Sequence, residues 1–160
     1  KDIQDWLTMA NARARLRMTT LYAFASHYKL LVAGTGNKVE DFGVGFFTKY
    51  GDGGVDISPI ADLVKTEVYE LAKELEIVES IQKAAPTDGL WADGRNDEDQ
   101  IGATYPELEW AMAYLENPGN FSELTKRQRE VLDIYERLHK ANLHKMQPIP
   151  VCKIPQDLKK

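Results

Sequence analysis

The sequence predicts an α/β fold in which a buried parallel strand lies among helices. The first observation is a continuous apolar run from Leu30 to Ala33 that ends at Gly34-Thr35-Gly36. A parallel strand covered on both faces has this pattern. The second is the helical spacing of apolar residues on both sides of the run. Because one strand cannot make a parallel sheet, we expect further strands upstream, in a longer protein of which this chain is a piece.

Composition narrows the classes of protein to which this chain could belong. Its 160 residues, 43% of them hydrophobic, are enough for one domain with its own core. Acidic residues outnumber basic ones by 25 to 20, so the net field opposes loose binding of nucleic acid. A single cysteine, Cys152, excludes an internal disulfide and a multi-cysteine metal site. Apolar runs are short and no signal-peptide pattern opens the chain, so we expect a cytoplasmic protein that binds no membrane.

The first part of the chain is expected to hold one helix and one strand. From about Thr8 to Tyr28 apolar residues recur at helical spacing, which predicts a helix. The strand follows at residues 30–33, and its carboxyl end opens into a loop that contains two glycines. Ligands bind at this end of the strands in open α/β sheets, so the segment 34–40 is the first candidate site.

The rest of the chain is expected to be mostly helical. Ser58-Pro59 has the pattern of a helix start, a cap and then a proline in the first turn. One apolar face follows it, at Ile60, Val64, Val68, Leu71 and Leu75. Tyr105-Pro106 opens another helix, and Ser122 is expected to cap a last long one.

Two segments break this regular pattern. Residues 83–100 contain Pro86, Gly89 and an acidic run, which predicts a long surface loop with no apolar face to anchor it. Residues 148–160 contain three prolines and predict an irregular tail. We therefore divide the chain into residues 1–147, which form part of one domain rich in helices, and this tail.

Small residues and single polar groups at the end of the predicted strand suit a bound ligand. Thr35 offers a hydroxyl between two glycines, which let a ligand approach the backbone, and Glu40 offers a carboxylate. Magnesium is usually held by one or two carboxylates and by substrate phosphates, so Glu40 could be a metal ligand beside a nucleotide. The spacing alone is more often that of a helix cap followed by a solvated glutamate.

A second candidate is the segment 45–56, in which glycines and aspartates around Lys49 leave little to pack. Such a loop suits a polar dinucleotide, with Lys49 for a phosphate or carboxylate, Asp56 for sugar hydroxyls and aromatic rings for stacking. A hairpin-like turn with surface charges explains the pattern as well. Near the end of the last helix, His144 and Lys145 could reach an anion, although a solvated helix end explains them too.

Several motifs occur in an order that matches a known family. They are the segment 11–18 (Asn-Ala-Arg-Ala-Arg-Leu-Arg-Met), residues 34–40, the segment 45–52 (Gly-Phe-Phe-Thr-Lys-Tyr-Gly-Asp), residues 59–65 and Pro86-Thr87. The Phe-Phe-Thr-Lys-Tyr-Gly-Asp string is highly specific. Through about Met146 the chain resembles the NAD synthetases, which make NAD from deamido-NAD, ATP and ammonia.

This resemblance implies a fold and a set of site residues. The fold would be the Rossmann-like layered parallel sheet of the ATP-pyrophosphatase group. The residues that would touch deamido-NAD are Arg15, Lys49, Asp56, His144 and Lys145. Those that would touch ATP are Thr35, Lys65 and Thr87. Glu40 would bind Mg²⁺, and Phe46 or Phe47 would line the nicotinate site.

The resemblance also implies a reaction and a homodimer. The nicotinate carboxylate would attack the α-phosphate of ATP, giving an adenylate and pyrophosphate, and ammonia would then displace AMP. The family's Ser-Gly-Gly-x-Asp-Ser loop, which cradles the phosphates, is absent from the 160 residues, so we expect the chain alone to be inactive. No glutaminase domain is visible, which favours free ammonia. Met146 departs from the arginine that often follows His-Lys in the family.

Two other interpretations of the sequence stay open. A related adenylating amidotransferase such as GMP synthetase would share the fold, although it would not explain the Phe-Phe-Thr-Lys-Tyr-Gly-Asp string. A non-catalytic dinucleotide-binding or dimerisation module would keep the pocket without the reaction. Binding of deamido-NAD with ATP, of guanine nucleotide precursors, or of a dinucleotide alone would distinguish the three.

Overall fold

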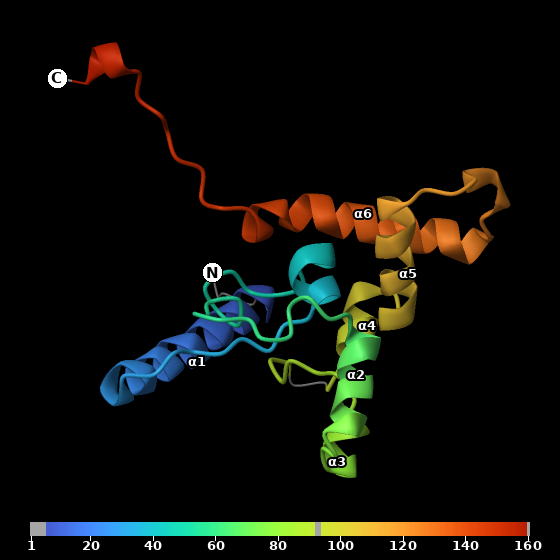
Figure 1. Cartoon of the computed structure of the whole chain (residues 1–160), viewed down its shortest axis with the longest axis horizontal. Coiled ribbons are helices and arrows are strands. Elements are labelled where there is room, and N and C mark those ends of the chain that lie inside the picture. The colour runs from blue at the N-terminus through green and yellow to red at the C-terminus, as the bar shows by residue number, and fades with distance from the viewer. Residues whose placement is uncertain (1–5, 92–93, 160) are drawn as a thin grey trace.

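Helices of very different length, joined by extended segments, build the part of the chain that the computed structural model describes, residues 6–91 and 94–159 (Figure 1). In chain order the elements are α1 (Trp6–Tyr28), the π-helical turn η1 (Val39–Val44), α2 (Lys65–Glu74), α3 (Glu79–Gln82), α4 (Asp97–Ile101), α5 (Tyr105–Glu116), the 3-10 turn η2 (Phe121–Glu123), α6 (Lys126–Met146) and the 3-10 turn η3 (Gln156–Leu158). None of the described helices combines the length and the apolar character needed to cross a membrane.

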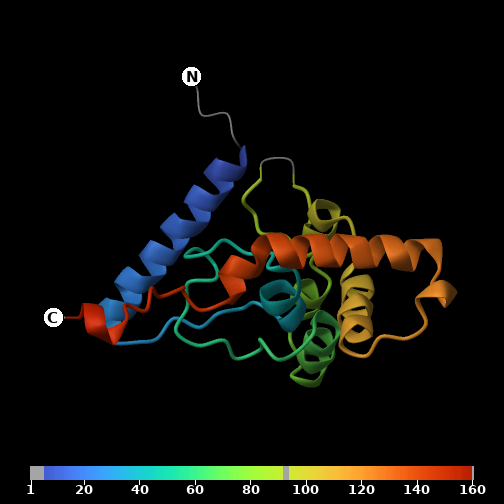
Figure 2. The same cartoon turned by 90° about the horizontal axis from the view of Figure 1, so that it is seen from above.

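The main hydrophobic core lies where α5, α6 and η1 meet (Figure 2). Leu108 of α5 is fully buried, in one cluster with Val131 of α6. The turn η1 contributes Val39 and Val44, both of which are 0% exposed. Because Glu40 follows Val39 in the same turn, packing of this core fixes where the candidate metal ligand lies.

The predicted first helix is confirmed as α1, which lies along one edge of the molecule (Figure 1). Its buried residues are the small Ala10, Ala14 and Ala25. Several of its large apolar side chains are more than half exposed, among them Leu16, Leu21 and Phe24. The helix therefore presents an apolar surface that the described chain leaves open.

The predicted strand at residues 30–33 is extended but hardly paired. Ala33 and Ile57 form an isolated parallel bridge, next to which the N–H of Gly34 donates to the carbonyl of Ile57 at 2.7 Å. No regular strand forms in the described residues. A parallel strand needs a neighbour along its whole length, and here Leu30 and Leu31 remain 65% and 67% exposed. The layered sheet is thus not formed within the described chain.

The helix predicted to start at Ser58-Pro59 is wrong in its first turns. Residues 59–63 form turns, and α2 begins only at Lys65. The backbone of this segment is used elsewhere, since the carbonyl of Leu63 accepts from the N–H of Lys38 at 2.8 Å. The predicted apolar face is only partly buried: Val64 packs against the main core, whereas Leu71 and Leu75 are 40% and 62% exposed.

The surface loop predicted for residues 83–100 is shorter than expected and has an apolar anchor. Its last part forms α4, which Asn96 caps by accepting a hydrogen bond from the N–H of Asp99 at 2.7 Å. Leu90 is buried in a small cluster with Ala10 and Ala14 of α1. The composition of the segment hid this contact because one leucine is not a periodic pattern.

The last two helices are confirmed, with one change of cap. α5 starts at Tyr105 as predicted, whereas α6 is capped by Thr125, whose hydroxyl accepts from the N–H of Gln128. Ser122 lies earlier, in η2, and bonds to Asn120. The described residues of the tail after Met146 are exposed and irregular apart from η3, and they leave the body of the molecule (Figure 1).

Candidate functional site

Glu40 lies in η1, three positions after a buried asparagine that shapes the turn. The side-chain oxygen of Asn37 accepts hydrogen bonds from the N–H groups of Val39 and Glu40, each at 3.1 Å. Asparagine caps a helix start in this way. Asn37 is 1% exposed, and its side-chain amide nitrogen has no partner among the described residues. The carboxylate of Glu40 is thereby held at the end of the extended segment.

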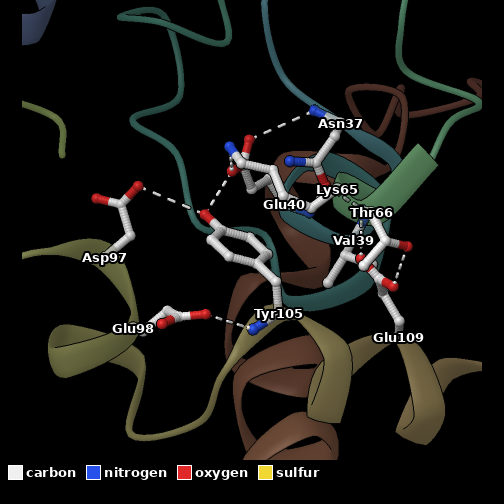
Figure 3. Close-up of polar contacts among 9 residues, drawn as sticks. All are labelled: Asn37, Val39, Glu40, Lys65, Thr66, Asp97, Glu98, Tyr105 and Glu109. Carbon is white, nitrogen blue, oxygen red and sulfur yellow. Dashed lines mark hydrogen bonds and ion pairs between the residues drawn. The ribbon is translucent and has the colours of Figure 1, made fainter. Parts of the chain in front are cut away.

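The ammonium group of Lys65 contacts this carboxylate. Lys65 is the first residue of α2, and its Nζ lies 2.9 Å from Oε1 of Glu40. The side chains of Lys65 and Glu40 are only 20% and 14% exposed, so water screens their attraction less than at an open surface. The structure therefore brings together two of the residues predicted to serve ATP and its metal (Figure 3).

Tyr105, which in the sequence indicates only the start of a helix, contacts both of these residues. Its hydroxyl donates to Oε1 of Glu40 and lies 3.4 Å from Oδ2 of Asp97, while Nζ of Lys65 lies 4.8 Å from the centre of its ring. Burial and then the negative charge of Glu40 raise the pKa of Tyr105. Glu40 and Tyr105 are 65 positions apart, so no local pattern could have linked them.

Two lysines tie the predicted dinucleotide loop to α6. Nζ of Lys49 donates to the carbonyl of His144 at 2.6 Å. In the opposite direction, Nζ of Lys145 donates to the carbonyls of Gly45 and Phe47 at 2.9 and 2.7 Å. Neither ammonium lies within ion-pair distance of a carboxylate in the described part of the chain. Both ammonium groups are thus held by carbonyl oxygens, and Asp52 acts on Lys145 only from beyond ion-pair distance.

Arg15 of α1 adds a third cation to this place. Its Nε donates to the carbonyl of Lys49 at 3.3 Å. The loop can pass close to α1 because Gly51 has no side chain: a Cβ there would lie 2.9 Å from that of Ala14. Arg15, Lys49 and Lys145 therefore meet around one loop.

Asp56 lies at the extended segment, where its carboxylate has partners within the chain. Its carboxylate accepts from the N–H of Val32 at 2.9 Å and from the hydroxyl of Tyr22 at 3.0 Å. In the described chain it is linked to neither Lys49 nor Lys145 by a hydrogen bond or an ion pair. Asp56 thus holds the extended segment against α1.

The other three predicted residues are exposed. Thr35 makes no side-chain hydrogen bond with the described residues, and the ring of His144 likewise projects outward, with only its carbonyl in use. The hydroxyl of Thr87 donates to the carbonyl of Arg95 at 3.3 Å and accepts from the N–H of Gly89 at 3.2 Å. Among the described residues, Thr35 and Thr87 therefore form no side-chain hydrogen bond with Glu40, Lys65 or Lys49, and His144 meets Lys49 only through its carbonyl.

Known proteins match the chain over most of its length. The family model of NAD synthase matches residues 1–149. The NH(3)-dependent NAD(+) synthetase of Carboxydothermus hydrogenoformans is 46% identical over 123 residues, which cover 77% of this chain and 50% of the relative. The protein of the same name from Sulfurisphaera tokodaii is 39% identical over 158 residues, which cover 96% of this chain and 56% of the relative. The chain thus spans about half the length of the curated relatives it matches.

Solved structures of synthetases also superpose on this chain. The NMN synthetase from Francisella tularensis superposes with a TM-score of 0.78 at 35% identity, covering 96% of this chain and 58% of that one. The NH3-dependent NAD synthetase from Campylobacter jejuni does so with a TM-score of 0.70 over the same shares, at 24% identity, which supports the fold alone. The chain belongs to the NAD synthase family.

Proposed function

We propose that the protein containing this chain joins ammonia to the nicotinate carboxylate of deamido-NAD, with ATP as the activating substrate. The observation that carries the proposal is the presence of two separate polar groups on one core. One group pairs a carboxylate with a lysine, Glu40 with Lys65. The other gathers the cations of Arg15, Lys49 and Lys145 around a loop. A reaction between two phosphate-containing substrates needs two such places.

The first group fits a hard cation and a triphosphate. Lys65 shows that Glu40 attracts a cation, since its ammonium is bound to Oε1. Oε2 of Glu40 keeps only a long contact of 3.4 Å from the N–H of Asn37 among the described residues. Bound Mg²⁺ would supply charge neutralisation on the phosphates, with Glu40 as its ligand from this chain. Thr35 and Thr87 would offer hydroxyls to ATP from the exposed ends of their segments.

The second group would hold deamido-NAD. Arg15, Lys49 and Lys145 would bind its phosphates or its carboxylate, and burial lowers the pKa of Lys145, which reflects the cost of keeping that charge inside. His144 would add its exposed ring, and Asp56 would accept from a sugar hydroxyl if ligand binding releases Tyr22. Phe46 or Phe47 would stack on the nicotinate ring.

The reaction would proceed in two displacements. The nicotinate carboxylate attacks the α-phosphate of ATP, the bond to pyrophosphate breaks, and a nicotinate adenylate forms. Ammonia then attacks the activated carbonyl, the bond to AMP breaks, and the nitrogen loses its extra proton to solvent. Lys65 neutralises charge on the phosphates, and the second group aligns the dinucleotide, so that catalysis rests on positioning and electrostatics.

The remaining half of the protein is part of the proposal. We propose that it adds strands beside residues 30–33 to give the Rossmann-like parallel sheet, and that the protein is a cytoplasmic homodimer. The exposed Leu30 and Leu31, and the open apolar side chains of α1, support the need for further covering surface. It follows that the 160-residue chain alone is expected to be inactive.

The test is an assay of the full-length protein with deamido-NAD, ATP, Mg²⁺ and ammonium. We expect NAD and AMP to form in equal amounts, and no product when ATP is left out. Formation of ADP instead of AMP, or dinucleotide binding without any turnover, would contradict the proposal; the latter would favour the non-catalytic module. A parallel assay of the 160-residue chain is expected to give no NAD, and robust turnover there would reject the need for the other half.

Nicotinate mononucleotide is the second candidate substrate, because the solved structure at 35% identity is an NMN synthetase. Both substrates carry the same nicotinate carboxylate, so the reaction would be unchanged. Competition between the two at equal concentration measures the preference directly. We expect deamido-NAD to be used faster, and xanthosine monophosphate, the precursor in a GMP synthetase, not to react.

A further inference from the structure

A single tyrosine contacts both members of the Glu40–Lys65 pair (Figure 3). The Tyr105 side chain is 3% exposed. Its hydroxyl donates to Oε1 of Glu40, and its ring faces Nζ of Lys65 at 4.8 Å, a distance typical of a cation–π contact. The tyrosine therefore acts on a carboxylate through its polar tip and on an ammonium through its ring.

The place of Tyr105 is rigidly determined by its own helix. It is the first residue of α5, where the N–H of Thr104 bonds to the side chain of Glu107 at 2.9 Å and Pro106 occupies the first turn. The N–H of Tyr105 donates to the side chain of Glu98 at 2.8 Å. Fixed backbone on both sides means that the phenol cannot follow Glu40 if that side chain moves.

The two oxygens of the Glu40 carboxylate have different surroundings. Oε1 accepts from both Tyr105 and Lys65. Oε2 keeps only the 3.4 Å contact with the N–H of Asn37 within the described residues. Carboxylates that bind metals are commonly held by a hydrogen bond to one oxygen while the other faces the ion. Here the hydroxyl of Tyr105 supplies that hydrogen bond to Oε1.

We propose that Tyr105 is a positioning residue for the metal and triphosphate site: it fixes Oε1 of Glu40 so that Oε2 faces a divalent cation, and it steers Lys65 toward the phosphates. This inference rests on the proposed function, in which Glu40 is the metal ligand. The phenol O–H donates to Oε1 of this carboxylate, which is the contact that fixes its position. Loss of such a supporting partner typically weakens metal binding by about 10- to 100-fold.

The test measures binding of Mn²⁺ to the full-length protein by electron paramagnetic resonance, with an ATP analogue that has a methylene group between its α- and β-phosphates. Tyr105→Phe keeps the ring and removes the hydroxyl, and we expect it to weaken Mn²⁺ binding about tenfold or more. Tyr135→Phe is the matched control. Tyr135 is 5% exposed in the same core, and its hydroxyl has no hydrogen bond with the described residues. Its removal should leave Mn²⁺ binding unchanged.

A third variant separates failure of this inference from failure of the proposed function. If Glu40→Gln weakens Mn²⁺ binding and Tyr105→Phe does not, Tyr105 has no positioning role and the metal assignment stands. If Glu40→Gln has no effect, the metal assignment is wrong and the inference falls with it. Equal weakening by the Tyr105 and Tyr135 variants would indicate general damage to the core and overturn the specific role.

A second readout covers the case in which Tyr105→Phe does not fold. 3-Fluorotyrosine placed at position 105 keeps the hydroxyl and reports its surroundings by fluorine resonance. Addition of Mg²⁺ with the ATP analogue should shift this resonance, because the carboxylate that accepts the hydrogen bond gains a cation. A resonance that stays in place at saturating Mg²⁺ contradicts the proposal.

Discussion

Nζ of Lys49 donates to the carbonyl of His144 at 2.6 Å, across 95 positions of the sequence. The acceptor lies in the last turn of α6, whose carbonyls carry the negative end of the helix dipole. Lys145 of the same turn donates back to the loop that carries Lys49, through the carbonyl of Phe47. The two lysines thus hold one loop against the end of one helix through hydrogen bonds to carbonyl oxygens.

Replacement of Lys49 by alanine should therefore weaken the binding of deamido-NAD far more than the binding of ATP. A charge-assisted hydrogen bond contributes about 1.5–3 kcal/mol, so we expect an increase of roughly tenfold to a hundredfold in the dissociation constant for deamido-NAD. Calorimetric titration of the full-length protein with each substrate is the measurement. Lys73→Ala, on the outer part of α2, is the control and should change neither constant. Equal losses for both substrates from Lys49→Ala would remove Lys49 from the dinucleotide site.

Gly45 is a position at which a side chain does not fit, so its substitution should weaken the contact between the loop and α6. Its φ of +62° is rarely adopted by residues with a side chain, and a Cβ there would lie 2.5 Å from Cβ of Asn142 on α6. Gly45→Ala should lower the free energy of unfolding by about 1–3 kcal/mol. It should also weaken the binding of deamido-NAD, because the new methyl group pushes α6 away from the loop. Gly119→Ala is the control, because a Cβ there has an ordinary contact of 3.6 Å with Tyr114. The measurement is denaturant unfolding of both variants. Equal free energies of unfolding for Gly45→Ala and Gly119→Ala would contradict the prediction and show that the loop adapts to the added methyl group.

The sequence predicted the site better where residues are close along the chain than where they are distant. Helix α1 and the cap of η1 follow local rules of spacing and capping, and both were accessible from residue patterns. Motifs of the family indicated that Glu40 and Lys65 belong to one site, and the structure joins them at 2.9 Å. Tyr105 could not be found, because its link to Glu40 depends on how α5 packs against η1.

The strand at residues 30–33 shows a second limit. Its apolar run correctly predicts an extended conformation, but pairing depends on neighbours and not on the run itself. In the described chain its partner segment, residues 54–57, contributes a single bridge, at Ala33 and Ile57. Asp56 likewise has structural partners that its motif did not indicate, since its carboxylate accepts from the N–H of Val32 and the hydroxyl of Tyr22.

Glu40→Gln keeps the shape of the side chain and removes the charge that a hard cation requires. In the full-length protein we expect lower turnover and a Mg²⁺ concentration for half-maximal rate that rises by about tenfold or more. The matched control is Glu74→Gln at the exposed end of α2, which should leave the Mg²⁺ titration unchanged. An unaltered titration for Glu40→Gln would reject Glu40 as a ligand.

The start of α5, which carries Tyr105, should lose stability in acid. Arg127 bonds to both oxygens of Glu107, at 2.7 and 2.8 Å, and lowers the pKa of that carboxyl to about 2. A lowered pKa stabilises the folded state above the usual value near 4.5, and this contribution is lost as the pH falls from there toward 2. Because water reaches the pair, whose Arg127 and Glu107 side chains are 46% and 30% exposed, its contribution to stability should be small.

The measurement is urea unfolding of the wild type and of Glu107→Gln at pH 7 and at pH 3. The variant should be less stable at pH 7 and should differ less from the wild type at pH 3. Glu130→Gln removes the other acidic partner of Arg127, which lies at 3.2 Å, and should have a smaller effect. A constant difference between wild type and Glu107→Gln at both pH values would contradict the assigned pKa.

The segment that carries Thr87 is expected to close over the nucleotide and to exclude water from the adenylate. Without ligand it is held to α1 by arginines: NH1 of Arg13 donates to the carbonyl of Leu90 at 2.6 Å, and Arg17 donates to the carbonyls of Asp88 and Gly89 at 2.8 and 3.1 Å. Limited proteolysis of the full-length protein between residues 83 and 100 should therefore be slow in the wild type and faster in Arg17→Ala. Arg15→Ala, whose guanidinium contacts Lys49 instead, is the control for ligand-free cleavage. ATP and deamido-NAD together should slow cleavage of the segment in every variant that binds them. Cleavage at the same rate with and without both substrates would show that the segment does not close over the nucleotide and that Thr87 is an ordinary surface residue.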